Sequence, residues 1–336
     1  MRNAARLAAV ALCFALAPHE AGAWGATGHR LIGEDAIKAL PDEVPAFLRG
    51  DAAAAAMGEL AREPDRWKGA GATHDGARDP GHFLDLDDFG RVNGGPLLSA
   101  LPVTREDYES ALRAAGTDST KSGWLPYSII DNWQQIVRDF ALWRAAKAGV
   151  QFAKGDAQRF WLDADASRRE QLILRDIGEF AHYVGDGSQP LHVTVHYDGW
   201  GPGPNPSKFT EERIHARFEG AFVRDNATEA SVLAAMPPYH DCKCEIAAAT
   251  AQYLRATNTQ VAPLYTIEKK GSFKAKNKEE IAFATARLAA GAAELRDLIV
   301  DAWHASGSQA VGYPPTPLAD VESGKVDAYA LLYGND

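Results

Sequence analysis

The chain has 336 residues, of which 46% are hydrophobic and 24% charged, and its 45 acidic and 35 basic residues give a net charge of −10. This composition is typical of a globular protein and excludes an intrinsically disordered chain. The acidic balance argues against binding duplex DNA through a broad basic surface, and no apolar run reaches the roughly 18 residues that a membrane-spanning helix needs.

The first 23 residues have the pattern of a secretory signal peptide. A basic start is followed by an apolar stretch over residues 7–17 and by the small residues Ala-Gly-Ala at 21–23, after which signal peptidase cuts. The apolar stretch is short for an uncleaved anchor helix. We therefore expect cleavage before Trp24 and a secreted or periplasmic protein.

Apolar residues recur every three to four positions along much of the remaining chain, and this period indicates amphipathic helices. The clearest predicted helices cover residues 29–40, 129–143, 173–184, 246–256 and 281–302. No internal repeat or compositional boundary divides the chain. We predict one all-α domain over residues 24–336, with helices to about residue 305 and little or no sheet.

Non-helical segments are expected between these helices. Strand-like alternation occurs only briefly, over residues 193–197, and loops are expected at 69–81, 90–102 and 199–207 and in the proline-rich tail from Pro314. The two cysteines of the mature chain form a C-x-C pair, which closes only a tight disulfide and provides no disulfide framework. A core or bound metal must therefore stabilise the fold.

Histidine and carboxylate residues recur at metal-ligand spacings in the second half of the predicted domain. His182 and Asp186 lie four residues apart on a predicted helix, so both project from one face, and His215 and Glu219 repeat this spacing on another predicted helix. His192 follows the first pair after a Gly/Pro break. Imidazole nitrogen and carboxylate oxygen are typical zinc ligands, with manganese or iron as alternatives. Each pair alone is more often a helix-surface hydrogen bond, but two such pairs with His192 within residues 182–219 make a metal site an equal alternative.

Several motifs resemble a known enzyme family. The segments are Trp24–His29 (WGATGH), Glu63–Arg66 (EPDR), His82–Asp85 (HFLD) and His182–His192 (HYVGDGSQPLH). They are similar, in this order, to motifs of the type I single-strand nuclease/3′-nucleotidase family, which shares its fold and a trinuclear zinc site with the zinc-dependent bacterial phospholipases C. The resemblance covers residues 24–219 and implies an all-α fold of this type.

This resemblance implies three zinc ions bound by side chains and by the free N-terminus. The first ion would take Asp65, His82, His182 and Asp186, the second His192, His215 and Glu219, and the third Trp24, His29 and Asp186. Trp24 would bind through its α-amino nitrogen and carbonyl oxygen, which explains why processing should end there. The resemblance also implies that Asp65 orients the attacking water or accepts its proton.

Lys68 is the second residue to which we assign a catalytic role. It lies three residues after Asp65 on a predicted helix, where it could contact a phosphoryl oxygen of the substrate. A solvated surface lysine is the alternative interpretation.

The substrate class is less well defined than the chemistry. We expect an endonuclease acting on single-stranded DNA or RNA, with 3′-nucleotidase activity on nucleotides. Glu219 departs from the nucleases, which usually carry aspartate there, and Gly123–Tyr127 (GWLPY) resembles bacterial members grouped with the lipases. Phospholipid is therefore the alternative substrate, and a non-catalytic zinc-stabilised exported protein the second alternative. No protein partner is evident.

Two further features have open interpretations. His196 shares a face with His192 if the segment between them is a strand, which makes it a weaker ligand candidate. Five lysines surround Phe273 and form either a single-strand-binding loop or a solvated one. These lysines are Lys269, Lys270, Lys274, Lys276 and Lys278.

Overall fold

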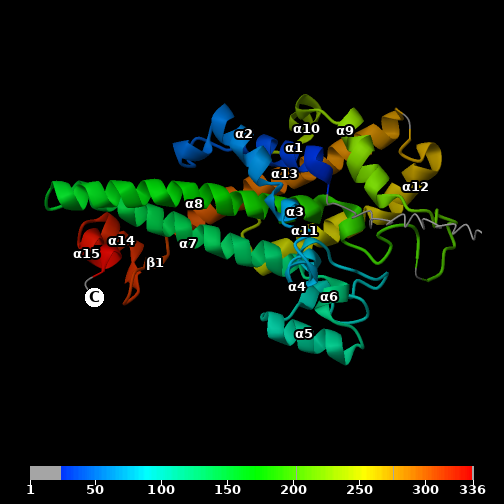
Figure 1. Ribbon diagram of the computed structural model, residues 1–336, viewed down its shortest axis with the longest axis horizontal. Coiled ribbons are helices and arrows are strands. Elements are labelled where there is room, and N and C mark those ends of the chain that lie inside the picture. The colour runs from blue at the N-terminus through cyan, green and yellow to red at the C-terminus, as the bar shows by residue number, and fades with distance from the viewer. Residues whose placement is uncertain (1–23, 202, 275, 335–336) are drawn as a thin grey trace, which may run out of the picture.

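The computed structural model describes residues 24–201, 203–274 and 276–334. The predicted signal peptide, residues 1–23, lies outside the described residues. Within them helices dominate, and the one regular sheet is a two-stranded antiparallel ribbon, so the predicted all-α fold with little sheet is confirmed (Figure 1). In these ranges, no helix combines the length and the apolar character that crossing a membrane requires.

The described elements follow one another in this order. The α-helices are α1 (Gly25–Lys38), α2 (Asp51–Leu60), α3 (Glu63–Arg66), α4 (Ala72–Gly76), α5 (Arg105–Ala114), α6 (Ser119–Ser122), α7 (Leu125–Phe152), α8 (Asp156–Ser188), α9 (Val223–Asn226), α10 (Glu229–Ala235), α11 (Ile246–Asn258), α12 (Val261–Gly271), α13 (Lys278–Ser306), α14 (Leu318–Glu322) and α15 (Ala328–Tyr333). The shorter elements are the 3₁₀ turns η1 (Ala46–Leu48), η2 (Asp79–His82), η3 (Leu98–Ala100) and η4 (Pro190–His192), the π-helix η5 (Arg217–Phe222), and the strands β1 (Ala310–Val311) and β2 (Thr316–Pro317).

A long antiparallel pair, α7 and α8, forms the framework of the fold (Figure 1). Helices α1 and α13 pack across it near the C-terminal end of α8, and together these four helices enclose the main core. Phe140, Phe180, Leu295 and Ile299 are fully buried in it. The five helices predicted from periodicity correspond to α1, α7, α8, α11 and α13, because each carries the apolar stripe that packs against this core.

The proline-rich tail is not a loop, contrary to our prediction. It forms the β1–β2 ribbon and the helices α14 and α15, which lie beside the end of the α7–α8 pair remote from α6 (Figure 1). Val311, Leu318 and Val321 are buried in a second apolar cluster with Leu162 of α8. Burial of these side chains orders the tail despite its prolines.

The prediction of a brief strand at residues 193–197 is also wrong. This segment follows the turn η4 and makes single hydrogen bonds to a neighbouring segment rather than a regular ladder. Leu84 N–H donates to His192 O at 2.8 Å, and Val195 N–H donates to Leu86 O at 2.9 Å. The predicted loops at 69–81 and 90–102 likewise contain short helical turns, α4, η2 and η3.

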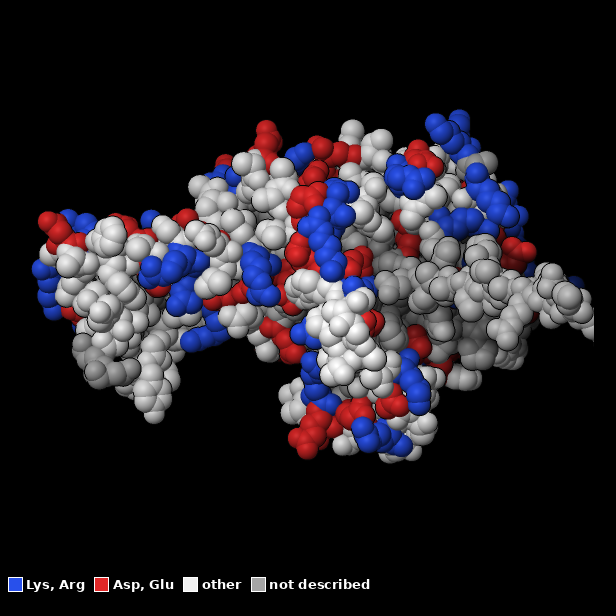
Figure 2. Space-filling model, viewed as in Figure 1, with Lys and Arg blue, Asp and Glu red and all other residues white. Residues whose placement is uncertain are grey.

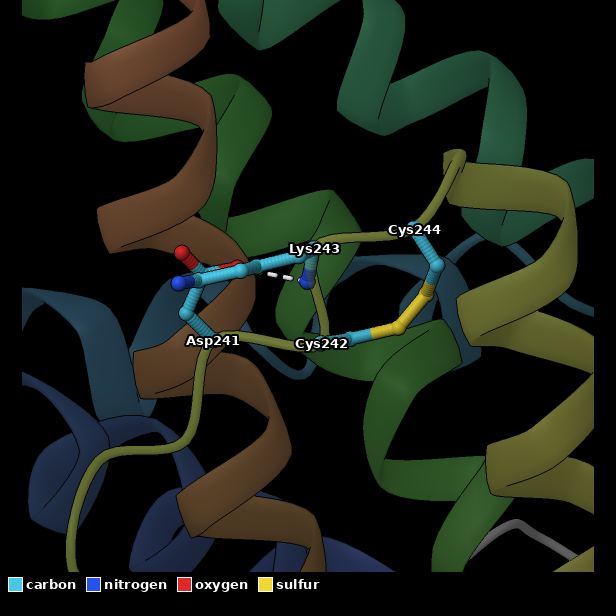
Figure 3. Close-up of a disulfide and its surroundings, with 4 residues drawn as sticks. All are labelled: Asp241, Cys242, Lys243 and Cys244. Carbon is cyan, nitrogen blue, oxygen red and sulfur yellow. Dashed lines mark hydrogen bonds between the residues drawn. A yellow bond between two sulfur atoms is a disulfide. The ribbon is translucent and has the colours of Figure 1, made fainter.

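The C-x-C pair is oxidised. A disulfide joins Cys242 and Cys244 in the loop between α10 and α11 (Figure 3). Lys243 between them has a positive φ of 51°, and its N–H donates a hydrogen bond to Asp241 Oδ1 at 2.7 Å. The loop also contacts α13, where Tyr239 Oη donates to Asp301 Oδ1 at 2.7 Å.

Candidate metal centre

The last turns of α8 carry the central pair of the candidate site. His182 and Asp186 are both fully buried, one helical turn apart on the same face. Gly185 lies between them, and a Cβ there would stand 3.1 Å from Nδ1 of His29 on α1. The glycine therefore lets α1 approach closely enough for the His29 and His182 rings to stack at 3.9 Å. His29 Nε2 then lies 3.5 Å from Asp186 Oδ1.

A second set of contacts brings α3 and η2 to the same residues. His182 Nε2 lies 2.8 Å from His82 Nδ1 and 3.8 Å from Asp65 Oδ1, and Asp186 Oδ2 lies 3.1 Å from His82 Nδ1. Asp65 remains partly exposed, whereas His82, His182 and Asp186 are buried. The two carboxylate oxygens of Asp186 thus face different histidines, the arrangement that a bridging ligand requires.

The third group joins the turn η4, which follows α8, to the π-helix η5. Glu219 Oε2 lies 2.9 Å from His215 Nε2 and 3.6 Å from His192 Nε2. The buried amide of Gln189 donates to the same oxygen at 3.1 Å. An ordinary helix was predicted here, but Glu219 lies on a π-helical turn, a form that is frequent at functional sites.

Trp24 packs between the end of α8 and the π-helix η5, where its ring contacts Phe218. It is fully buried, and its indole Nε1 donates to Ser188 Oγ at 2.7 Å. Gly25 has a positive φ of 46°, and a Cβ there would stand 3.2 Å from the carbonyl oxygen of Glu219. Trp24 O accepts the N–H of Gly28 at 3.1 Å, while metal binding through its amino nitrogen stays a prediction.

Hydrogen bonds to backbone carbonyls orient two of the imidazoles. Nδ1–H of His182 donates to Ala61 O at 2.9 Å, and Nδ1–H of His192 donates to His82 O at 2.7 Å. Each bond leaves the lone pair of Nε2 facing the cluster. This is the usual way in which proteins fix a metal-ligating histidine.

Six buried side-chain atoms at this site make no hydrogen bond of acceptable geometry, although some of them lie close to an oppositely charged group. They are both ring nitrogens of His29, both of His215, Nε2 of His192 and Oδ1 of Asp186. A buried polar atom without a partner costs about 1–3 kcal/mol, so a cluster of them needs a compensating ligand. Three groups could hold metal ions: His29–His182–Asp186, Asp65–His82–His182 and His192–His215–Glu219. Their nitrogen and oxygen donors fit zinc.

The electrostatics favour metal-binding protonation states for most of the ligands. Burial lowers the pKa of His29, His82 and His182, so these imidazoles are neutral and their lone pairs free. Burial and the nearby Asp65 carboxylate raise the pKa of Asp186 well above its usual range. A bound cation opposes that shift because it favours the carboxylate.

Glu219 behaves differently from Asp186. Burial acts to raise the pKa of Glu219, but His215 and His192 outweigh burial and bring it down to about 2. Burial likewise acts to lower the pKa of His215, and Glu219 reverses this and raises it. Attraction between the Glu219 carboxylate and the His215 imidazolium therefore stabilises the His192–His215–Glu219 group.

A cleft of about 370 Å³ opens onto the cluster. His82, His192 and His215 line it, and so does Lys68, whose Nζ lies 2.6 Å from Asp65 Oδ1. The Lys68 side chain is only 12% exposed, so the alternative of a solvated surface lysine is wrong. Burial acts to lower the pKa of Lys68, but the carboxylates of Asp65 and Asp186 outweigh it and raise it. A larger hollow of about 580 Å³ between α3 and α8 contains none of the predicted ligands.

Among the residues that line or support the site, Gln189, Asp85 and Lys121 are polar residues to which the sequence assigned no role. Gln189 and Asp85 lie within the motifs quoted above, so their positions were visible but their contacts were not. Burial raises the pKa of Asp85, which lines the cleft, to about 7. Lys121 lines the same cleft and is preceded by no motif that would have revealed it.

His196 is not part of the cluster. Its Nε2 lies 3.1 Å from Asp88 Oδ1, and its ring stacks on Trp200 at 3.9 Å. The weaker ligand interpretation of His196 is therefore wrong.

The lysine tract around Phe273 is not an open stacking loop. Phe273 is buried against Phe218, with 4.7 Å between the ring centres. Lys269 and Lys270 end α12, and Lys278 begins α13. Base stacking on Phe273 is excluded by its burial.

Comparisons with families and with curated proteins identify no relative of this chain. A scan against models of protein families finds no match, and a search of curated proteins finds none either.

Proposed function

We propose that this chain is a zinc-dependent phosphodiesterase that cleaves single-stranded DNA or RNA and has 3′-nucleotidase activity. The observation that carries the proposal is the set of three His/carboxylate groups, two of which share His182, with His82, His192 and His215 lining one cleft beside a buried lysine. Adjacent metal sites of this kind are typical of enzymes that hydrolyse phosphate esters. The motif resemblance points to the same chemistry.

The donor set supports three zinc ions in the grouping given by the resemblance. One would bind Asp65, His82, His182 and Asp186; one would bind His192, His215 and Glu219; one would bind His29 and Asp186 with the N-terminus of Trp24. When bound, such ions neutralise charge on phosphoryl oxygens and promote ionisation of water at neutral pH. The manganese and iron alternatives share these donors.

Two side chains of the protein would act directly on the reacting groups. Asp65 is partly exposed and held by Lys68, so its carboxylate can orient a water molecule and accept its proton. The Lys68 ammonium lies in the cleft, where a phosphoryl oxygen can receive one of its hydrogen bonds. The contact between Asp65 and Lys68 holds both side chains in position before the substrate binds.

The cleft favours a nucleic acid substrate over a lipid. Tyr197 is half exposed, and both Tyr197 and Phe83 line the cleft. Aromatic rings of this kind stack on unpaired bases. A duplex keeps its bases stacked and paired, so single strands should be cleaved faster. Glu219 carries the charge and donor type of aspartate and therefore does not select the substrate. Acidic and basic side chains are interspersed on the face in Figure 2, consistent with local rather than extended strand binding.

The testing experiment uses mature protein that begins at Trp24, loaded with zinc, as export and cleavage would produce it. Single-stranded DNA, RNA, duplex DNA and phosphatidylcholine vesicles are assayed with and without chelator. We expect cleavage of single strands that chelator abolishes. His182→Ala should lower the cleavage rate at least a hundredfold because it removes a shared candidate ligand. His196→Ala should change the rate little. Release of phosphocholine with nucleic acids left intact would establish the lipase alternative. Full zinc content without hydrolysis of any substrate would establish the non-catalytic one.

A further inference from the structure

Two lysines line the cleft among its described residues, and their environments differ sharply. Lys68 is 12% exposed and fixed against Asp65 at 2.6 Å. Lys121 is 72% exposed, and its Nζ lies 3.1 Å from Asp118 Oδ2. An exposed pair of this kind contributes little to stability, so Lys121 can exchange Asp118 for another anion at little cost.

The backbone that carries Lys121 is nevertheless firmly placed beside the metal ligands. Asp118 caps the short helix α6 by accepting the N–H of Lys121 at 3.1 Å. The next residue, Ser122, accepts the N–H of Asp85 at 2.9 Å, so α6 is joined to the segment that follows His82. The position of the lysine is fixed while its ammonium group stays free to move.

The size of the cleft determines which part of a bound strand can contact Lys121. At about 370 Å³ it is near the lower limit of ligand pockets, so it accommodates only the part of a strand around the scissile phosphate. The adjoining phosphate of a bound strand must lie at the cleft mouth. An exposed, positioned ammonium there can make a charge-assisted hydrogen bond to that phosphate.

We propose that Lys121 forms a second phosphate-binding site, which binds the phosphate next to the scissile one in a single-stranded nucleic acid. The inference rests on the function proposed above and deepens it. A phosphatidylcholine molecule has no second phosphate, so this site distinguishes polymeric substrates from phospholipid. Lys121 acts on binding, and we expect its effect in KM rather than in kcat.

The test compares thymidine dinucleotide with one phosphate, TpT, with the trinucleotide TpTpT, which has two. Lys121→Ala should lower kcat/KM for TpTpT by roughly fivefold, whereas the loss should be absent for TpT, which offers no second phosphate. The salt dependence of kcat/KM for TpTpT should become shallower by about 0.7 in logarithmic slope. Lys121→Arg keeps the charge and should keep most of the wild-type rate.

Lys325 supplies a matched control. It is 71% exposed and lies 3.1 Å from Asp320 Oδ1, the same exposure and contact as Lys121, but it belongs to the tail. Lys325→Ala should leave kcat/KM for both substrates, and its salt dependence, unchanged. Melting curves of all variants confirm folding.

The outcomes separate this inference from the proposed function. Cleavage of TpTpT by Lys121→Ala at the wild-type rate would overturn the second site while leaving the nuclease proposal intact. An equal loss on TpT and TpTpT would also overturn it, because it would place Lys121 at the scissile phosphate itself. If the zinc-loaded wild-type enzyme cleaves neither substrate, the nuclease proposal fails and this inference with it.

Discussion

Asp35 on α1 is a buried carboxylate without a hydrogen-bond partner. Its side chain is fully buried, and neither oxygen has a donor. Burial and the nearby Glu229 raise its pKa from 3.8 to about 7. The folded protein therefore binds a proton at Asp35 over a pH range in which the unfolded chain has lost it.

We expect this residue to make stability fall as the pH rises from about 4 to 7. Because the folded-state pKa lies above the unfolded value, the contribution of Asp35 is most favourable below pH 4 and is lost as the pH passes through 7. Asp35→Asn removes the ionisation and should raise the free energy of unfolding by about 1–3 kcal/mol at pH 8. This gain should shrink as the pH falls toward 4.

Thermal melts of both proteins from pH 4 to 8 measure this effect. Asp163→Asn, at an exposed position of α8, is the control and should give parallel curves at every pH. A constant difference between Asp35→Asn and wild type across the range would show that Asp35 does not titrate as argued.

The sequence indicated the members of the candidate metal-binding groups better than it indicated individual contacts. His182, Asp186 and His192 could be named as candidate ligands because ligand chemistry demands particular residue types at particular spacings. The burial of Lys68 and the partnerless state of Asp35 depend on residues distant in the sequence, which spacing does not encode. The same holds for Lys121, whose role depends on where α6 lies in space.

At the scale of elements, amphipathic helices were predictable and context-dependent segments were not. Long helices such as α8 and α13 carry a repeated apolar stripe, which is visible in the sequence. The π-helix η5 has no such pattern, and the alternation at 193–197 reflects a segment that crosses from the core to the surface. The tail helices α14 and α15 are too short to be stable alone and form because they pack on α7.

Leu318 tests how the tail contributes to the fold. It is 1% exposed in the second apolar cluster, so Leu318→Ala should destabilise the protein by about 2–4 kcal/mol through lost burial and a cavity. The cluster contains no candidate metal ligand, so metal content should be unchanged. Denaturant unfolding and metal analysis measure the two quantities.

Leu172→Ala on α8 is the control. This leucine is 44% exposed, so its replacement should lower the free energy of unfolding far less. Loss of metal from folded Leu318→Ala would contradict the separation of tail and metal centre.

For the whole molecule, the candidate metal centre connects segments that are far apart in the chain. Its groups draw on α1, α3, η2, the end of α8, η4 and the helical turn that runs into η5. The sequence order of these ligands was predictable from the resemblance, but their convergence depends on how α1 and α13 pack across α8. Because the same contacts form the metal centre and hold the segments together, metal binding and folding should be coupled.

Removal of metal should therefore lower the melting temperature as well as abolish activity. A ligand present at a thousand times its Kd stabilises the folded state by about 4.1 kcal/mol, and for a domain of this size that corresponds to a shift of roughly 6 °C. His192→Ala removes one ligand group, so chelator should lower its melting temperature less than that of wild type. His304→Ala changes a half-exposed histidine outside the three groups and should respond to chelator as wild type does. A wild-type melting curve that does not move after metal analysis has verified complete loss of the ions would contradict this coupling.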